Sequence, residues 1–155
     1  MIYGKNNTHK GLITIRNLSE EKMQKITPFL WFDDNAEEAV NFYTSVFKDS
    51  KIGSVSRYSK DTPGKEGALM TASFTLFGQE FTALNGGPVY KFNPAISFVI
   101  SCEDQDEVDY YWKRLSEGGE QVQCGWLTDK FGISWQVVPK ILAELLGSED
   151  KDKVY

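Results

Sequence analysis

The chain has 155 residues, of which 41% are apolar and 25% charged, and its formal net charge at neutral pH is −5. This length and composition are those of one globular domain or of two small halves that share a core. The acidic balance argues against nucleic acid as a partner, because phosphate binding needs a basic face, and no apolar run reaches the roughly 18 residues of a membrane span.

The two ends of the chain look unlike its middle. Residues 1–22 hold a polar, turn-like stretch from Asn6 to Gly11, and a strand pattern follows soon after Met23. We interpret residues 1–22 as an N-terminal extension that is not native, such as a tag or the product of an upstream start codon. Residues 147–155 are expected to form a charged, frayed tail.

Cysteine usage points to a reducing compartment. The chain has only two cysteines, Cys102 and Cys124, and it is long enough to fold without disulfide bonds or a structural metal. No apolar segment followed by small residues marks a signal peptide. We therefore expect reduced thiols and a cytoplasmic protein, with a disulfide between the two cysteines as the disfavoured alternative.

The first half of the domain has the pattern of a strand, a helix and three further strands. Leu30 and Phe32 alternate with Phe29 and Trp31, which is typical of a strand whose two faces differ. The following helix carries apolar residues at three- and four-residue spacing. The expected elements are a strand at 26–32, a helix at 36–47, a strand at 51–58, and a hairpin of strands at 68–76 and 80–85.

The second half repeats this order after a linker that begins with Asn85, Gly86, Gly87 and Pro88. The expected elements are a strand at 95–101, a helix capped by Asp104 or Asp106 that reaches about residue 116, strands at 120–124, 126–128 and 134–138, and a short helix at 140–146.

The helices of the two halves correspond at a spacing of 69 residues. Tyr43 and Trp112 are such a pair, as are Val46 and Leu115. Phe29 and Phe98 also match at this spacing, but the alternation of the first strands places them on opposite faces. We give the alternation more weight, which implies a slip of one residue. Two βαβββ modules, 23–87 and 93–139, would form an α+β protein whose eight largely antiparallel strands curl around a cleft with helices outside.

The chain resembles the vicinal oxygen chelate superfamily, which has the glyoxalase and bleomycin-resistance fold, and within it the PhnB-like branch, many of whose members are labelled demethylubiquinone methyltransferases. The resemblance covers about residues 23–146. It rests on residues 26–32, on Ala36, Glu37, Glu38 and Ala39 with Phe42 and Tyr43, on residues 85–88, and most specifically on residues 124–139. The resemblance implies the fold described above and, from family habit, a homodimer.

Metal-using members of the superfamily place His, Glu or Gln on the first and last strands of each module. The corresponding positions here fall near Thr27, at 83–85, near Ala95 and at Gln136. Threonine, alanine and neutral amides do not make a transition-metal site, which needs imidazole, thiolate or carboxylate ligands. The one histidine, His9, lies in the extension. We therefore expect no metal and no cofactor.

The sequence predicts a cleft for a small, partly apolar molecule. Its expected lining residues are Phe29, Trp31, Asn85, Ser97, Trp126 and Gln136. Gln136 either orients a ligand or makes a structural hydrogen bond across the sheet. The tryptophans either stack on a ligand or pack in the ordinary way. Trp135 and Tyr43 are expected in the core.

Catalytic groups are hard to place in this cleft. Cys124 has no histidine near it to activate the thiol. Asp129 is the nearest candidate ionisable group, although it more naturally shapes the turn at 129–132. Methyl transfer from S-adenosylmethionine usually needs a glycine-rich turn between a strand and a helix, whereas Gly86 and Gly87 lead into a loop. Binding is therefore favoured over two alternatives: an enzyme acting on a quinone-like or aromatic substrate, and a protein that sequesters an antibiotic.

Overall fold

The computed structural model describes residues 24–147, so the interpretations of residues 1–22 and of the charged tail beyond residue 147 concern parts of the chain outside the described residues. The first module contains β1 (Phe29–Phe32), α1 (Ala36–Val46), β2 (Ser50–Arg57), β3 (Leu69–Leu76) and β4 (Gln79–Asn85). The second contains β5 (Ser97–Cys102), α2 (Gln105–Ser116), β6 (Glu120–Gln121), β7 (Trp126–Thr128), β8 (Ser134–Pro139) and α3 (Lys140–Gly147).

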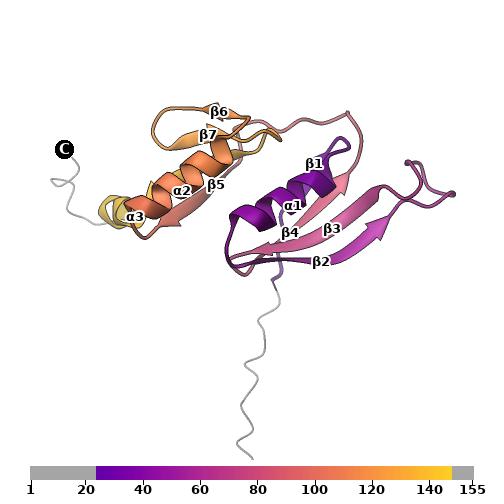
Figure 1. Cartoon of the computed structure of the whole chain (residues 1–155), viewed down its shortest axis with the longest axis horizontal. Coiled ribbons are helices and arrows are strands. Elements are labelled where there is room, and N and C mark those ends of the chain that lie inside the picture. Colours follow the sequence, from indigo (N-terminus) through magenta and orange to yellow (C-terminus); the bar gives the residue numbers. More distant parts are fainter. Residues whose placement is uncertain (1–23, 148–155) are drawn as a thin grey trace, which may run out of the picture.

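The strands form two four-stranded sheets with equivalent topology. The order is β1-β4-β3-β2 in the first sheet and β5-β8-β7-β6 in the second. In each sheet the first strand of the module pairs in parallel with the last, and the other pairings are antiparallel. Figure 1 shows α1 and α2 on the same side of the molecule, each lying over its own sheet. The α+β fold with two βαβββ modules is therefore confirmed.

Side-chain alternation places the core between each sheet and its helix. In β3, Ala72, Phe74 and Leu76 are buried, whereas the threonine and serine side chains between them are half-buried. This period of two matches the pleat of a strand that has only one covered face. Below, the face of each sheet turned away from its helix is called the open face.

The first strand is shorter than the sequence predicts. It begins at Phe29 rather than at Ile26, because Pro28 has no N–H to donate to a neighbouring strand. The Pro28 carbonyl still accepts a hydrogen bond from the Thr82 amide at 2.9 Å. The remaining boundaries agree within a few residues, and α2 takes Asp104 as its N-cap through a 2.9 Å bond to the Glu107 amide.

The one-residue slip between the modules is confirmed. Phe29 is 60% exposed on the open face of the first sheet, whereas Phe98 packs against the core and contacts the Trp135 ring at 5.4 Å. The helices share the slip, since the fully buried Tyr43 of α1 corresponds to the buried Tyr111 of α2. Side-chain alternation thus predicts orientation better than the ungapped spacing does.

The two modules meet through aromatic side chains and one buried carboxyl group. Tyr43 lies within 5.6 Å of the Trp135 ring, and Phe47 lies within 5.1 Å of the Tyr111 ring. Tyr43 also donates a 2.6 Å hydrogen bond to Asp129, which is 2% exposed. Trp135 is 4% exposed, so the expected core positions of Tyr43 and Trp135 are confirmed.

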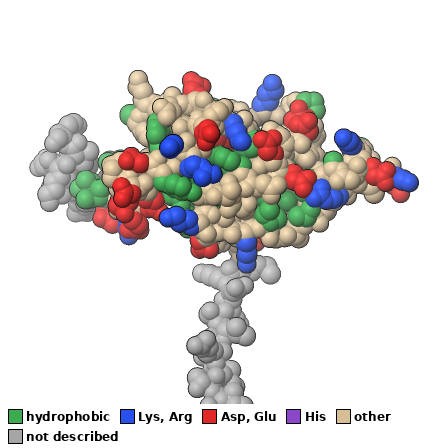
Figure 2. Space-filling view, viewed as in Figure 1, with side chains coloured by type: hydrophobic (Ala, Val, Ile, Leu, Met, Phe, Trp, Pro, Cys, Tyr) green, Lys and Arg blue, Asp and Glu red, His purple; other side chains and the backbone are tan. Residues whose placement is uncertain are grey.

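The surface on the helix side is mixed in charge. Figure 2 shows acidic and basic side chains interspersed over this face, with small apolar areas between them. No helix within residues 24–147 is long and apolar enough to cross a bilayer.

Candidate functional site

The predicted site residues of the first module lie on both sides of its sheet. Phe29 and Trp31 are on the open face of β1. The Trp31 indole N–H donates to the Gly87 carbonyl at 2.9 Å, and its ring meets Tyr90 edge-on at 5.0 Å. Trp31 is therefore already packed against the linker between the modules.

Asn85 is on the opposite side of this sheet, facing α1. It is 8% exposed. Its Oδ1 accepts a 2.8 Å bond from the Ala36 amide and its Nδ2 donates a 3.0 Å bond to the Leu69 carbonyl. Both ends of the amide are thus committed to holding α1 and β3, and a ligand role for Asn85 stays an untested prediction.

The other three predicted residues do come together, on the open face of the second sheet. Gln136 donates from Nε2 to the Ser97 hydroxyl at 2.9 Å, and Trp126 lies directly opposite Gln136 in the β7–β8 register. The hydrogen bond is the structural alternative considered for Gln136, but within residues 24–147 the side-chain carbonyl oxygen of Gln136 has no hydrogen-bond partner. None of the six predicted residues lines the large apolar cavity described next.

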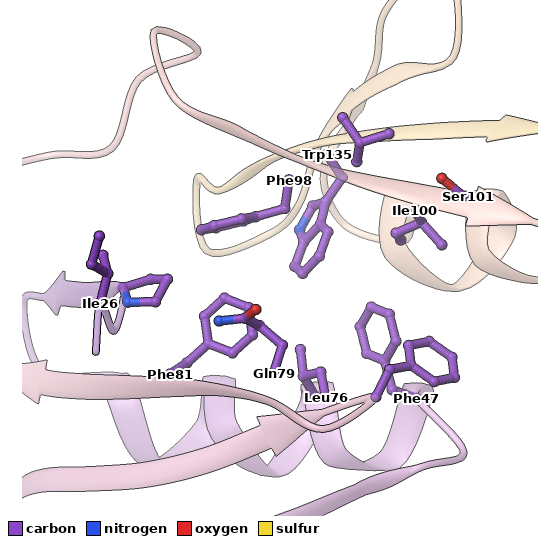
Figure 3. A pocket seen from close by; sticks show the side chains of 12 residues that line it. Ile26, Phe47, Leu76, Gln79, Phe81, Phe98, Ile100, Ser101 and Trp135 are labelled. Carbon is purple, nitrogen blue, oxygen red and sulfur yellow. The ribbon is translucent and has the colours of Figure 1, made fainter. Parts of the chain in front are cut away.

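A cavity of about 610 Å³ lies between the two modules. It falls in the usual size range of small-molecule pockets. Figure 3 shows side chains from the first module below it and from β5 and β8 above it. The lining residues are Ile26, Pro28, Phe47, Leu76, Phe77, Gln79, Phe81, Phe98, Val99, Ile100, Ser101 and Trp135.

Five aromatic rings form a continuous arc along this cavity. Successive ring centroids are 5.3 Å apart for Phe81 and Phe98, 5.4 Å for Phe98 and Trp135, 5.5 Å for Trp135 and Phe47, and 5.7 Å for Phe47 and Phe77. These spacings are those of favourable aromatic pairs. The arc combines rings from both modules, so it exists only when the modules are docked.

The polar groups at the cavity are few and neutral. The Gln79 side chain lies among the labelled rings in Figure 3, whereas the Ser101 side chain lies on the far side of β5. Trp135 directs its indole N–H away from the cavity, to Asp129 at 2.8 Å. Among residues 24–147, no charged side chain lines this cavity.

Asp129 is buried beside the arc rather than in the cavity. Its Oδ1 accepts from the amides of Phe131 and Ile133, and its Oδ2 accepts from Tyr43 and Trp135. Burial raises the pKa of the Asp129 carboxyl, and these four hydrogen bonds oppose that rise. Burial beside Asp129 also raises the pKa of Tyr43 well above its ordinary value. The Asp129 carboxyl and the Tyr43 hydroxyl are bonded to each other, so we assign both groups to the contact between the modules.

This arrangement defines a protein of the glyoxalase and bleomycin-resistance fold, with two βαβββ modules of equal topology in one chain. Within that class, residues 24–138 match the family model described as 3-demethylubiquinone-9 3-methyltransferase, and the chain belongs to this family. The comparison with curated proteins found no match.

One solved structure supports this family, and two others share the fold. A putative 3-demethylubiquinone-9 3-methyltransferase, the PhnB protein of Bacillus cereus, is 43% identical over 75% of this chain and 99% of its own, with a TM-score of 0.70. A protein from Pseudomonas aeruginosa is 22% identical over 76% of this chain and 98% of its own, with a TM-score of 0.63. The fosfomycin resistance protein FosX of Listeria monocytogenes is 17% identical over 82% of this chain and 99% of its own, with a TM-score of 0.59. The last two show a shared fold only.

The residues at the superfamily's metal positions do not fit a metal ion. Ala83 has no donor, the Asn85 amide is occupied by backbone groups, and Gln136 is a single neutral amide bonded to Ser97. Within residues 24–147 no three His, Cys, Asp or Glu side chains gather as a ligand set.

None of the five rings of the aromatic arc was predicted from the sequence as a cavity residue. Phe47, Phe81 and Phe98 follow the pattern of ordinary core residues, and nothing local distinguishes a core ring from one beside a cavity. Phe77 did carry a signal, because it precedes Gly78 in a two-residue hairpin turn, where a bulky aromatic residue is out of place.

Proposed function

We propose that this chain is a small-molecule-binding member of its family, and that the cavity between the modules holds a neutral, largely apolar ligand. The observation that carries the proposal is the cavity of about 610 Å³ lined by an arc of five aromatic rings. Apolar walls with a few polar groups are the usual make-up of small-molecule sites. A cytoplasmic location belongs to the proposal, and it agrees with Cys102 and Cys124 being free thiols.

The lining favours binding over acid–base chemistry. A general acid or base must reach the reacting atom through a hydrogen bond. Among residues 24–147, the cavity is lined by neutral side chains only. Asp129 and Tyr43, whose pKa values are both raised, bond to each other at 2.6 Å outside the cavity lining.

Methyl transfer, which the family description names, finds little support in the local backbone. Gly86 and Gly87 donate their amides to the carbonyls of Phe32 and Asp33, at 2.9 and 3.0 Å. A Cβ on Gly86 would lie 2.3 Å from the Trp31 ring, so this glycine accommodates the tryptophan. These amides are used within the fold, whereas a nucleotide-binding turn presents free amides at the start of a helix.

Blocking the cavity tests the proposal. We expect purified protein to enhance the fluorescence of N-phenyl-1-naphthylamine, a neutral aromatic probe, in a saturable way. Gln79→Trp should abolish this binding, because the indole would fill the space among the rings. Glu80→Trp is the matched control, since the next residue of β4 lies outside the cavity lining. Equal probe binding by both variants, or none by the wild type, would rule out the site.

We also propose that the chain acts as a homodimer. The open faces of both sheets carry exposed apolar side chains at their edge strands: Phe29 is 60% exposed on β1 and Val99 is 57% exposed on β5. Edge strands with exposed apolar residues are favourable places for a second chain to pack. A second copy packed on the second sheet would cover the open face that holds Trp126 and Gln136. The predicted cleft residues on that face would then line an enclosed site.

A further inference from the structure

Phe77 occupies a backbone position that its side chain disfavours. Together with Gly78 it forms the two-residue turn between β3 and β4, closed by the Leu76–Gln79 pair. Its φ is 50° and that of Gly78 is 75°. Turns with two positive φ values strongly prefer Asn, Asp or Gly at the first position, because a bulky side chain is strained in the left-handed region.

The backbone strain at Phe77 is not offset by deep burial of its ring. Phe77 is 52% exposed. It meets the Phe47 ring edge-on at 5.7 Å and the Tyr111 ring at 6.3 Å, and it is one of the residues that line the cavity. It is the last ring of the aromatic arc. A half-exposed aromatic residue in a strained turn therefore contributes less to the fold than an asparagine would.

We propose that Phe77 is a ligand-recognition residue, retained in a strained turn because its ring closes one end of the cavity against a bound aromatic molecule. The inference rests on the proposed binding function and makes it more specific. Strain held at a site where the rest of the fold determines the backbone is a known feature of binding positions. The arc supplies ring faces and edges, and Gln79 supplies one neutral amide, so the ligand class is a planar, uncharged aromatic molecule with a hydrogen-bonding substituent.

A second turn in the same chain provides a control for strain itself. Cys124 has a φ of 58° and precedes Gly125, whose φ is 78°. Cys124 is exposed and is absent from the cavity lining. Cys124→Asn and Phe77→Asn therefore create the same Asn-Gly pair in two turns, only one of which adjoins the cavity.

The experiment measures the Kd of N-phenyl-1-naphthylamine and the Tm for the wild type and both variants. Phe77→Asn should weaken binding about threefold to tenfold, the range of one aromatic contact, without lowering the Tm. Cys124→Asn should raise the Tm and leave the Kd unchanged. Phe77→Tyr, which keeps the ring, should bind as the wild type does. Phe77→Leu replaces the asparagine variant if the latter fails to fold, and it should also weaken binding.

An unchanged Kd in Phe77→Asn or Phe77→Leu would overturn the role of Phe77, whatever happens to the Tm. Weaker binding in Cys124→Asn to the same degree would also overturn it, because the effect would then follow from turn chemistry in general. Failure of the wild type to bind the probe has a different meaning, since it removes the proposed function itself.

Discussion

Asp129 accepts four hydrogen bonds, two from backbone amides of its own turn and two from Tyr43 and Trp135. Removing the acceptor would leave buried donors without partners, which costs more than the bonds themselves contribute. The residue therefore joins turn geometry to module docking: Oδ1 shapes the turn and Oδ2 fastens α1 and β8.

Asp129→Asn should lower the free energy of unfolding by about 2 kcal/mol at neutral pH. The asparagine Oδ1 still accepts from the turn amides, but its Nδ2 would face the Trp135 indole N–H, another donor. Tyr43→Phe removes one donor and should cost about 1.5 kcal/mol. Urea unfolding monitored by tryptophan fluorescence measures both. A larger loss for Tyr43→Phe than for Asp129→Asn would contradict this account, because Tyr43→Phe removes only one of the four donors to the carboxyl.

The wild type and Asp129→Asn should also differ in how their stability depends on pH. Burial raises the folded-state pKa of Asp129 above the ordinary 3.8. The folded state then holds the Asp129 proton more tightly than the unfolded state does. The free energy of unfolding therefore falls as pH rises from the unfolded-state pKa to the folded-state pKa of this carboxyl group. The stability difference between the wild type and Asp129→Asn should therefore shrink from pH 3.8 upward and become constant above the folded-state pKa. A difference that grows with pH would show that the four hydrogen bonds outweigh burial.

At the scale of elements, the two helices begin in different ways. The N-cap of α2 is local, since the Asp104 carboxylate accepts from the Glu107 amide at 2.9 Å. The N-cap residue of α1, Asn35, makes no side-chain capping bond. Asn85 from β4 caps the first turn of α1 instead, through the Ala36 amide. The start of α1 therefore depends on the sheet beneath it.

This difference predicts unequal costs. Asp104→Ala should lower the free energy of unfolding by about 1 kcal/mol, as an exposed cap does. Asn85→Ala should cost roughly 2–4 kcal/mol, because it leaves the Ala36 amide and the Leu69 carbonyl buried without partners. Chemical denaturation measures both. Probe binding by the folded Asn85→Ala variant should match the wild type; a weaker Kd at equal stability would restore Asn85 as a ligand residue.

At the scale of the whole molecule, a charge placed on the open face of the first sheet tests the proposed dimer. Sedimentation velocity should find a dimer of the wild type, and Phe29→Glu should shift it toward monomer, because the carboxylate would be buried without a partner. Ser56→Glu serves as the control, since it places the same charge on the far strand of that sheet. A monomeric wild type at tens of micromolar would contradict the proposal.

Local patterns were sufficient for most of the fold. The strand alternation separated Leu30 and Phe32 from Phe29 and Trp31, and the structure buries the first pair and exposes Phe29. The alternation also predicted the slip between the modules that the ungapped spacing hid. The helix stripes predicted Tyr43 as a core residue. These features depend on neighbours within a few residues, which the sequence displays directly.

The candidate site was less accessible to such reasoning. Asn85 at the end of a strand has the pattern of a polar residue at a rim, but its side chain turns toward α1 and caps it. Phe47 and Phe81 have the pattern of core residues, yet together with Phe98 and Trp135 they line a cavity. The sheet face on which a side chain lies and the group it contacts depend on residues distant in sequence. No local pattern therefore distinguishes a capping residue from a ligand residue, or a core ring from a ring that lines a cavity.

The sequence by itself determined the two modules, their family and the face on which most strand residues lie, because period, turn chemistry and residue type act over short distances. The tertiary structure alone decided where the modules dock. That docking buries Asp129 between Tyr43 and Trp135 and aligns rings from β4, β5, β8, the end of α1 and the β3–β4 turn around one cavity. A cavity is a property of surfaces brought together, and its existence depends on contacts between residues far apart in the chain.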